Sequence, residues 1–267
     1  MNRQQHRQSN GVLLLILLAV FIVSRVLDKR EPPPAPSAAT PVSTPVRNPV
    51  RDALQSTPRE YKDGIAAAIL IDTSGSMDLR VRDTDGEQRP KIEIARRAAL
   101  DIVNQFDSYA RDHSSQEVLL GIYEFSDRRQ MPLCRPVVKL GPPDPVASRE
   151  AISHMRAEGE TPIGDAMIVA KRELDAAGLS KRHILVITDG ENTMGYSPGD
   201  VTNVIASMAE NDRASIYFVA FDVAASKFKS VKDSGGLVLA ASNETELKGT
   251  LDYVLTGKIL AEQPNPR

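Results

Sequence analysis

The sequence has little net charge and almost no cysteine, and both shortages narrow the class of protein. Its single cysteine, Cys134, excludes an internal disulfide framework and a cysteine-based zinc site, so we interpret it as a packed thiol. A net charge of −2 gives no reason to expect nucleic acid binding. There is no Gly-x-x-x-x-Gly-Lys phosphate loop. The four histidines are scattered and form no local motif with a serine or the cysteine: His6, His113, His154 and His183.

An apolar segment without charges lies near the amino terminus. Its strictly apolar core, residues 12–23, is short for a membrane-spanning helix and would suit the core of a signal peptide. The stretch 11–27 can span if Arg25 extends its charge to the interface, and no small-residue cleavage site follows closely. We therefore predict an uncleaved single-pass anchor at 11–27, preceded by a polar tail at 1–10.

The orientation of this anchor is not decided by the positive-inside rule, because arginine and lysine lie on both sides of it. A long domain that follows an anchor crosses the membrane largely regardless of charge. We expect the following domain outside the cytoplasm.

Residues 28–60 are rich in proline, serine and threonine. Proline fixes its own backbone and restricts the residue before it, so this composition predicts an extended linker that does not fold as a unit. It could serve as a stalk that lifts a binding face away from the membrane, or as a disordered tether, and the composition leaves both open. A frayed tail is expected at 262–267.

Residues 61–261 alternate between apolar runs and amphipathic stretches, and a hydrophobic content of 41% is enough for a sizeable core. This alternation predicts an α/β domain with a doubly wound, mostly parallel sheet and helices on both faces. Strands are expected at 65–72, 117–125, 136–140, 183–189, 215–221 and 237–240, with 136–140 at an edge. Helices are expected at 91–111, 148–156, 164–177, 201–208 and 243–259.

The run 65–72 is apolar until it stops at Asp72, which Ser74 and Ser76 follow. Such a run fits a central strand, and ligands of parallel sheets bind beyond the carboxyl ends of the strands. Oxygen ligands suit a hard cation such as Mg²⁺. The alternative is an ordinary strand-to-loop turn whose hydroxyls cap a helix.

Two distant segments favour the metal site. Thr161 supplies a lone hydroxyl in a loop just before a helix, and Asp189 ends a second buried strand. With these residues the sequence resembles the von Willebrand factor type A domain family. The metal-ion-dependent adhesion site of that family consists of an Asp-x-Ser-x-Ser turn, a distant threonine and a distant aspartate. All five positions occur here in the family's order: Asp72, Ser74, Ser76, Thr161 and Asp189.

The resemblance covers roughly residues 61–260 and implies a function. In the family, the serines and the threonine contact the metal directly, and the aspartates usually act through water. A cation held mostly by neutral oxygens keeps much of its charge and can accept a carboxylate from a partner protein. The resemblance thus implies a module that binds Mg²⁺, or Mn²⁺, which accepts the same oxygen ligands, and through it an acidic residue of another protein.

The resemblance leaves two biological settings open. The module could work in adhesion or envelope assembly outside the cytoplasm, or as the accessory protein of a MoxR-type AAA+ ATPase, as similar membrane-anchored bacterial proteins do. A magnesium-dependent phosphatase of the haloacid dehalogenase type needs a second aspartate two residues after the first, where this chain has Ser74. We therefore expect a binding module and no enzyme.

Other polar segments near the predicted site are interpreted as structural. The acidic stretch 78–87 lacks the later ligands of a calcium-binding loop, so we predict a solvated loop. Asp165 could support the threonine loop from behind, or simply begin a helix. Ser126 and Asp127 are expected to be turn residues, and Asp222 an aspartate at the edge of the sheet.

Overall fold

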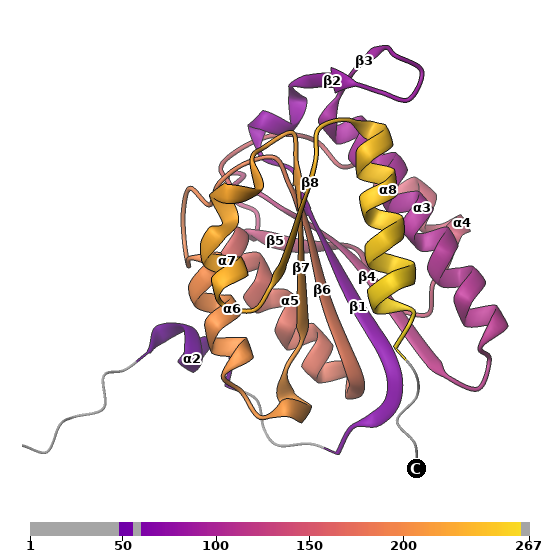
Figure 1. The fold of residues 1–267 in the computed structure, drawn as a ribbon, viewed down its shortest axis with the longest axis vertical. Coiled ribbons are helices and arrows are strands. Elements are labelled where there is room, and N and C mark those ends of the chain that lie inside the picture. The colour runs from indigo at the N-terminus through magenta and orange to yellow at the C-terminus, as the bar shows by residue number, and fades with distance from the viewer. Residues whose placement is uncertain (1–47, 56–59, 263–267) are drawn as a thin grey trace, which may run out of the picture. The chain divides into compact units, whose positions relative to one another are not determined.

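A six-stranded sheet organises the computed structural model, which describes residues 48–55 and 60–262 (Figure 1). Its strand order is β5-β4-β1-β6-β7-β8, and all neighbours are parallel except β4 and β5. The strands are β1 (Lys62–Asp72), β4 (Glu117–Phe125), β5 (Cys134–Gly141), β6 (Leu179–Thr188), β7 (Ser215–Phe221) and β8 (Leu237–Ala241). The described residues all belong to one compact unit.

Strand β1 lies at the centre of the sheet and is buried from Gly64 to Asp72. Its neighbours β4 and β6 run parallel to it, with Asp72 opposite Phe125. Successive side chains of a strand point to opposite faces, so an apolar run can fill the core on both sides. Ile69 packs in one hydrophobic cluster and Leu70 in the other. The predicted central strand and parallel sheet are confirmed.

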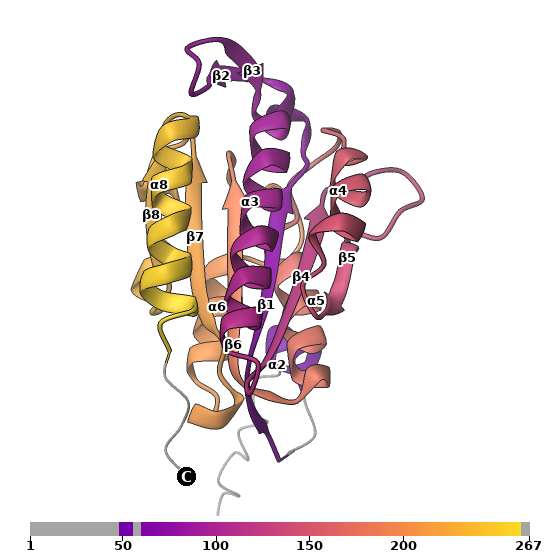
Figure 2. The same ribbon diagram turned by 90° about the vertical axis from the view of Figure 1, so that its right-hand side faces the viewer.

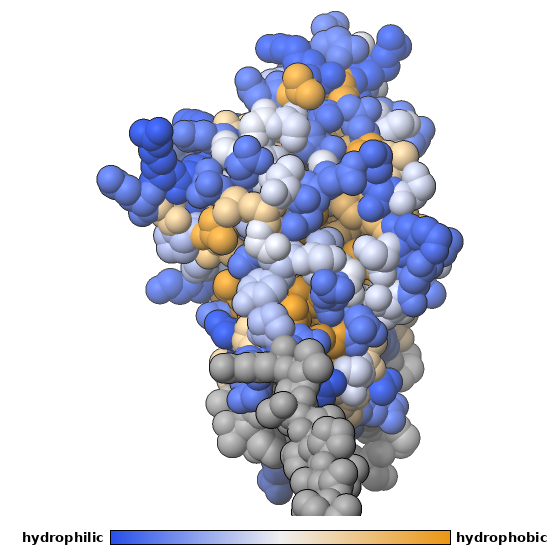
Figure 3. Space-filling view, turned by 90° about the vertical axis from the view of Figure 1, so that its left-hand side faces the viewer, coloured by the Kyte–Doolittle hydropathy of each residue, from blue (hydrophilic) through white to orange (hydrophobic). Residues whose placement is uncertain are grey.

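Helices cover both faces of the sheet. On one face lie α3 (Lys91–Asp112), α4 (Pro145–Ser153) and α8 (Glu244–Val254), which the π-helical turn η4 (Leu255–Ile259) continues (Figure 2). On the other face lie α5 (Ile163–Ala177), α6 (Pro198–Ala206) and α7 (Lys229–Asp233) (Figure 1). Short 3₁₀ turns are η1 (Gly75–Asp78), η2 (Glu210–Asp212) and η3 (Ala225–Phe228). Figure 3 shows a mainly hydrophilic surface on the α6 and α7 side, with apolar residues in small separate spots.

The predicted elements agree with these bounds to within a few residues. Helix α4 begins at Pro145, three residues before the predicted start, because the side chain of Asp144 accepts hydrogen bonds from the backbone N–H groups of Val146 and Ala147. That is an N-cap followed by proline at the first helical position. Helix α5 ends as predicted before Gly178, whose φ of 69° is left-handed.

Two predictions about irregular segments need correction. The linker predicted up to residue 60 contains a helix, α2 (Pro49–Ala53), and the side chains of Val50 and Leu54 are buried in the domain core. The segment 78–87 is mostly exposed, as predicted, but it is no plain loop, because β2 (Arg80–Arg82) pairs with β3 (Gln88–Pro90) in a hairpin. Its Asp83 is buried because the carboxylate accepts backbone N–H groups of Asp85 and Glu87 and pairs with Arg89.

The predicted anchor at 11–27 and the linker up to residue 47 lie outside the described residues. Among residues 48–55 and 60–262, no helix has the length and apolar character needed to cross a membrane.

Candidate metal centre

Asp72 is a fully buried carboxylate at the carboxyl end of β1. Its Oδ1 accepts the backbone N–H of Ser74 at 2.7 Å, and its Oδ2 accepts the hydroxyl of Thr188, at the end of β6, at 2.6 Å. Burial raises the pKa of Asp72 to about 6, the two hydrogen-bonding partners oppose this rise, and the charge of Asp189 adds to it. The backbone of its own turn and the end of the neighbouring strand β6 therefore fix the two carboxylate oxygens in direction.

The two serines connect this carboxylate to the end of the neighbouring strand β6. Ser76 lies in turn η1 and Ser74 directly precedes it. Their Oγ atoms are 3.1 Å apart. Ser76 donates its hydroxyl to Oδ1 of Asp189 at 2.7 Å. The predicted Asp-x-Ser-x-Ser turn and the distant aspartate are thus in direct contact. Ser76 and its neighbour Gly75 reach the solvent, so the cluster opens outward.

The loop that carries Thr161 is held against the first turn by backbone hydrogen bonds. Gly75 donates its N–H to the carbonyl of Gly159 at 3.0 Å. Gly159 has a φ of 89°, and a Cβ there would lie 1.9 Å from the carbonyl oxygen of Asp127, so only glycine fits. A Cβ on Gly190 would lie 3.9 Å from both the Ser76 Oγ and the Thr161 Oγ1. The two hydroxyls therefore flank the same glycine.

Two of the supporting residues were predicted to be structural. Asp127 pairs with Glu160 in an isolated β-bridge next to the threonine loop, which agrees with a turn residue. Asp165, at the start of α5, accepts the backbone N–H of Tyr196 at 2.9 Å. It supports the loop after β6 and does not hold the Thr161 loop itself, which bonds to Thr193.

Lys91 and Asp222 belong to the site, and the sequence prediction missed both. The Lys91 Nζ lies 3.0 Å from Oδ2 of Asp189 and 2.8 Å from Oδ2 of Asp222. Burial pulls the pKa of Lys91 down, but its bonds to Asp222 and Asp189 outweigh burial and leave it above its ordinary value. Asp222 is therefore no plain edge residue. A signal was present, because a lysine at the first position of a helix is an unfavourable placement.

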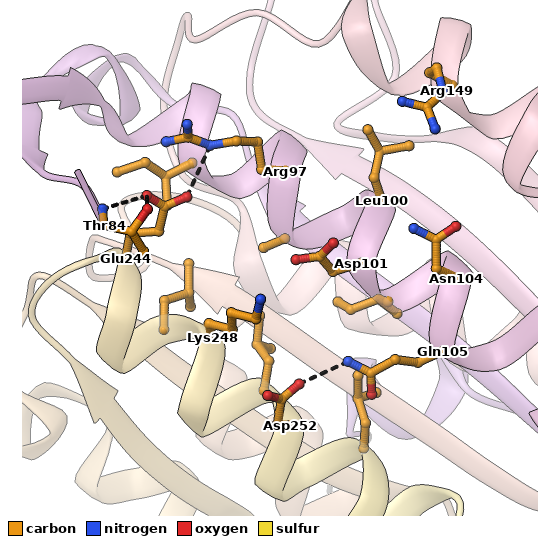
Figure 4. Close-up of a pocket in the computed structure, with 16 residues that line it drawn as sticks. Thr84, Arg97, Leu100, Asp101, Asn104, Gln105, Arg149, Glu244, Lys248 and Asp252 are labelled. Atoms are coloured by element: carbon orange, nitrogen blue, oxygen red, sulfur yellow. Dashed lines mark hydrogen bonds and ion pairs between the residues drawn. The ribbon is translucent and has the colours of Figure 1, made fainter. Parts of the chain in front are cut away.

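A separate hollow of about 290 Å³ lies between α3 and α8 (Figure 4). Glu244 joins three elements there: it accepts the backbone N–H of Thr84, after β2, at 2.9 Å and pairs with Arg97 of α3 at 2.9 Å. Gln105 donates to Asp252 at 2.8 Å farther along the two helices. None of the five predicted metal ligands lines this hollow.

All five predicted residues meet at the carboxyl ends of β1 and β6, and their donor set fits a hard cation. Three hydroxyls and two carboxylates offer only oxygen, as Mg²⁺ prefers. Adjacent ligands of an octahedral Mg²⁺ lie about 3.0 Å apart when each bond is about 2.1 Å, and the two serine Oγ atoms are 3.1 Å apart. The described part of the chain holds no group of three or more His, Cys, Asp or Glu suited to a metal, so the hydroxyls are essential to the fit.

The profile of the von Willebrand factor type A domain matches residues 68–250, which is more than half of the chain. The chain belongs to this family. The match includes all five residues of the cluster, Lys91 and Asp222. Domains of this family are typically interaction modules without enzymatic activity. No curated protein sequence matches the chain significantly.

Solved structures share the fold of this von Willebrand factor type A domain. A von Willebrand factor type A protein from Catenulispora acidiphila is 20% identical with a TM-score of 0.57, and the match covers 75% of this chain and 44% of that one. The conserved hypothetical protein BatB from Bacteroides thetaiotaomicron is 16% identical with a TM-score of 0.56, and the match covers 75% of this chain and 100% of that one. The open conformation of the pilus adhesin SpaC from Lactobacillus rhamnosus GG is 15% identical with a TM-score of 0.56, and the match covers 75% of this chain and 30% of that one.

Proposed function

We propose that this protein is a metal-dependent protein-binding module for adhesion or assembly. Asp72, Ser74, Ser76, Thr161 and Asp189 would hold Mg²⁺, or Mn²⁺, at the carboxyl end of the sheet. The observation that carries the proposal is the contact between the serine turn and Asp189, with the Thr161 hydroxyl beside them. When bound, the cation supplies an open position for an aspartate or glutamate of a partner protein.

The chain's own residues prepare this site. Asp72 is held in one orientation by Ser74 and Thr188, so its carboxylate is placed before any ligand arrives. The hydroxyls carry no charge and therefore do not neutralise a cation, which leaves charge available for a partner's carboxylate. The exposed backbone at Gly75 gives that carboxylate access.

We infer no enzymatic role from this arrangement. Ser74 occupies the position where a phosphatase of this general layout would carry its general acid. The described histidines make their hydrogen bonds elsewhere: His113 to Tyr109, His154 to Glu150 and His183 to Tyr217.

We also propose that residues 11–27 anchor the domain in a membrane, with the domain outside the cytoplasm. The support is the length and apolar character of that segment in the sequence. The pilus adhesin SpaC among the structures of the same fold agrees with an adhesive role outside the cell.

The test is a crosslinked capture of partners from membranes with wild type and Thr161→Val, each with Mg²⁺ and with chelator. The valine keeps the branched shape of threonine and removes one ligand oxygen. We expect one partner to be lost both in Thr161→Val and with chelator, and to be lost again when its contacting acidic residue is changed to the amide. The matched control is Thr202→Val, a buried threonine on α6 whose hydroxyl bonds to Pro198.

Partners that persist in Thr161→Val and in chelator would contradict the proposal. The binding face would then lie elsewhere, on the helices or the amino-terminal segment.

A further inference from the structure

Lys91 occupies a position that is unfavourable for a cation in two respects. It is 3% exposed, and burial of an ammonium group is costly unless it is paired. It is also the first residue of α3, where the partial positive charge of the helix end repels cations. Pro90 before it makes no capping hydrogen bond that would offset this charge. A lysine here must be stabilised by its partners.

Those partners are two carboxylates from two different strand ends. Asp189 follows β6, and each of its carboxylate oxygens has a different partner. Oδ1 accepts a hydrogen bond from Ser76 and Oδ2 accepts one from Lys91. Asp222 follows β7 and has a φ of 54°, a left-handed conformation that directs its carboxylate at Lys91. The Asp222 side chain is 43% exposed, whereas that of Asp189 is buried. Lys91 therefore connects a predicted metal ligand to an acidic group at the surface.

We propose that Lys91 is a built-in cation that sets the divalent-metal affinity of the site, and that Asp222 determines how strongly its charge acts on Asp189. This inference rests on the proposed function, because it assumes that Asp189 is a metal ligand. Lys91 partly neutralises that ligand and lies close enough to repel a second cation. Asp222 draws part of the lysine charge away from Asp189.

Substitutions of Lys91 and of Asp222 should change the metal affinity in opposite directions. Removing the lysine charge leaves Asp189 fully available, so metal binds more tightly. Removing the Asp222 charge leaves the lysine paired with Asp189 alone and takes a negative charge from the surroundings, so metal binds more weakly. The Asp222 effect is the smaller one, because solvent screens an exposed carboxylate.

The experiment measures the dissociation constant of Mn²⁺ for the full-length chain by electron paramagnetic resonance. We expect Lys91→Met to lower it by roughly tenfold or more, and Asp222→Asn to raise it by roughly threefold, as charge changes at this range allow. Thermal unfolding in chelator is the second readout. There Lys91→Met should melt lower than wild type, and adding Asp189→Asn should recover part of the loss, because an unpaired buried carboxylate is removed.

The matched control is Lys171→Met, which removes another buried lysine, one that pairs with Asp175 on α5. It should change the melting temperature and leave the Mn²⁺ affinity as in wild type. Wild-type affinity in both Lys91→Met and Asp222→Asn would overturn the inference and leave the proposed function standing. If Lys91→Met fails to fold, Asp222→Asn decides alone. Mn²⁺ binding by Asp222→Asn that is as tight as in wild type, or tighter, would then overturn the inference. Absence of Mn²⁺ binding by wild type and by every variant would instead overturn the proposed function, and this inference with it.

Discussion

His183 is a buried histidine whose surroundings keep it neutral. It lies on β6, with its Nδ1 3.5 Å from the hydroxyl of Tyr217 on the neighbouring strand. Burial, with a smaller contribution from the charge of Lys181, lowers the pKa of His183 to about 3. In the unfolded chain the same imidazole has an ordinary value near 6.5. The folded and unfolded states therefore bind different numbers of protons between these values.

This difference predicts a dependence of stability on pH. Between pH 6.5 and pH 3 the unfolded state binds the extra proton, so the free energy of unfolding falls as the pH falls. From pH 7 to pH 5 wild type should lose roughly 2 kcal/mol more than His183→Gln, whose side chain does not titrate. Urea unfolding at the two pH values measures this, and the exposed His154→Gln serves as the control. Equal losses in wild type and His183→Gln would contradict the prediction.

The sequence predicts single residues where a motif fixes them and misses residues that act through distant partners. Asp72, Ser74 and Ser76 are predictable because they place oxygen-bearing side chains at alternate positions where an apolar strand ends. Lys91 is not, because its partner Asp189 is 98 residues away. The unfavourable charge of a lysine at a helix start is a signal, but it does not identify the partner.

Helix α2 is attached to the domain by both packing and hydrogen bonds. Asn48 caps its first turn by accepting the backbone N–H groups of Val50 and Arg51. The Ala53 carbonyl after that turn accepts Arg172 of α5 at 2.8 Å. Leu54, just beyond the helix, is 2% exposed and packs in the core on the α5 and α6 side. The folded domain thus begins before β1.

Helix α2 therefore contributes to the stability of the domain. Leu54→Ala should lower the free energy of unfolding by about 2 kcal/mol, because it removes buried methyl groups and leaves a cavity. The control is Val146→Ala, at an exposed position of α4, which should change it by less than about 0.5 kcal/mol. The midpoint of urea unfolding measures both. If Leu54→Ala unfolds like wild type, the segment behaves as a tether and does not belong to the folded unit.

Elements with a clear apolar pattern are predictable from the sequence, and short elements without one are not. The strands of the sheet are apolar runs bounded by polar residues, and α3 repeats apolar residues at helical spacing. Strands β2 and β3 have three residues each, too few for an alternating pattern to be recognised in the sequence. The proline-rich composition around helix α2 predicts a linker and no helix, although Asn48 followed by Pro49 is a helix-start signal.

The topology of the whole domain explains why the metal cluster forms. Strands β1 and β6 are parallel neighbours, so their carboxyl ends meet at one edge of the sheet. Ser76 and Asp189 are 113 residues apart in the sequence and yet in hydrogen-bond contact. The sequence predicted this convergence from the joint pattern of five residues. It did not predict the orientation of the threonine loop, which depends on the close approach at Gly159.

We propose that Asp72, Ser74, Ser76, Thr161 and Asp189 form one site for a divalent cation. The most direct measurement is a titration of the full-length protein with Mn²⁺, followed by electron paramagnetic resonance and repeated with excess Mg²⁺. Wild type and Thr202→Val should bind one Mn²⁺ that Mg²⁺ displaces, and Thr161→Val should bind it at least tenfold more weakly, because one oxygen ligand is lost. Equal binding by wild type and Thr161→Val, or no binding by wild type, would contradict the account.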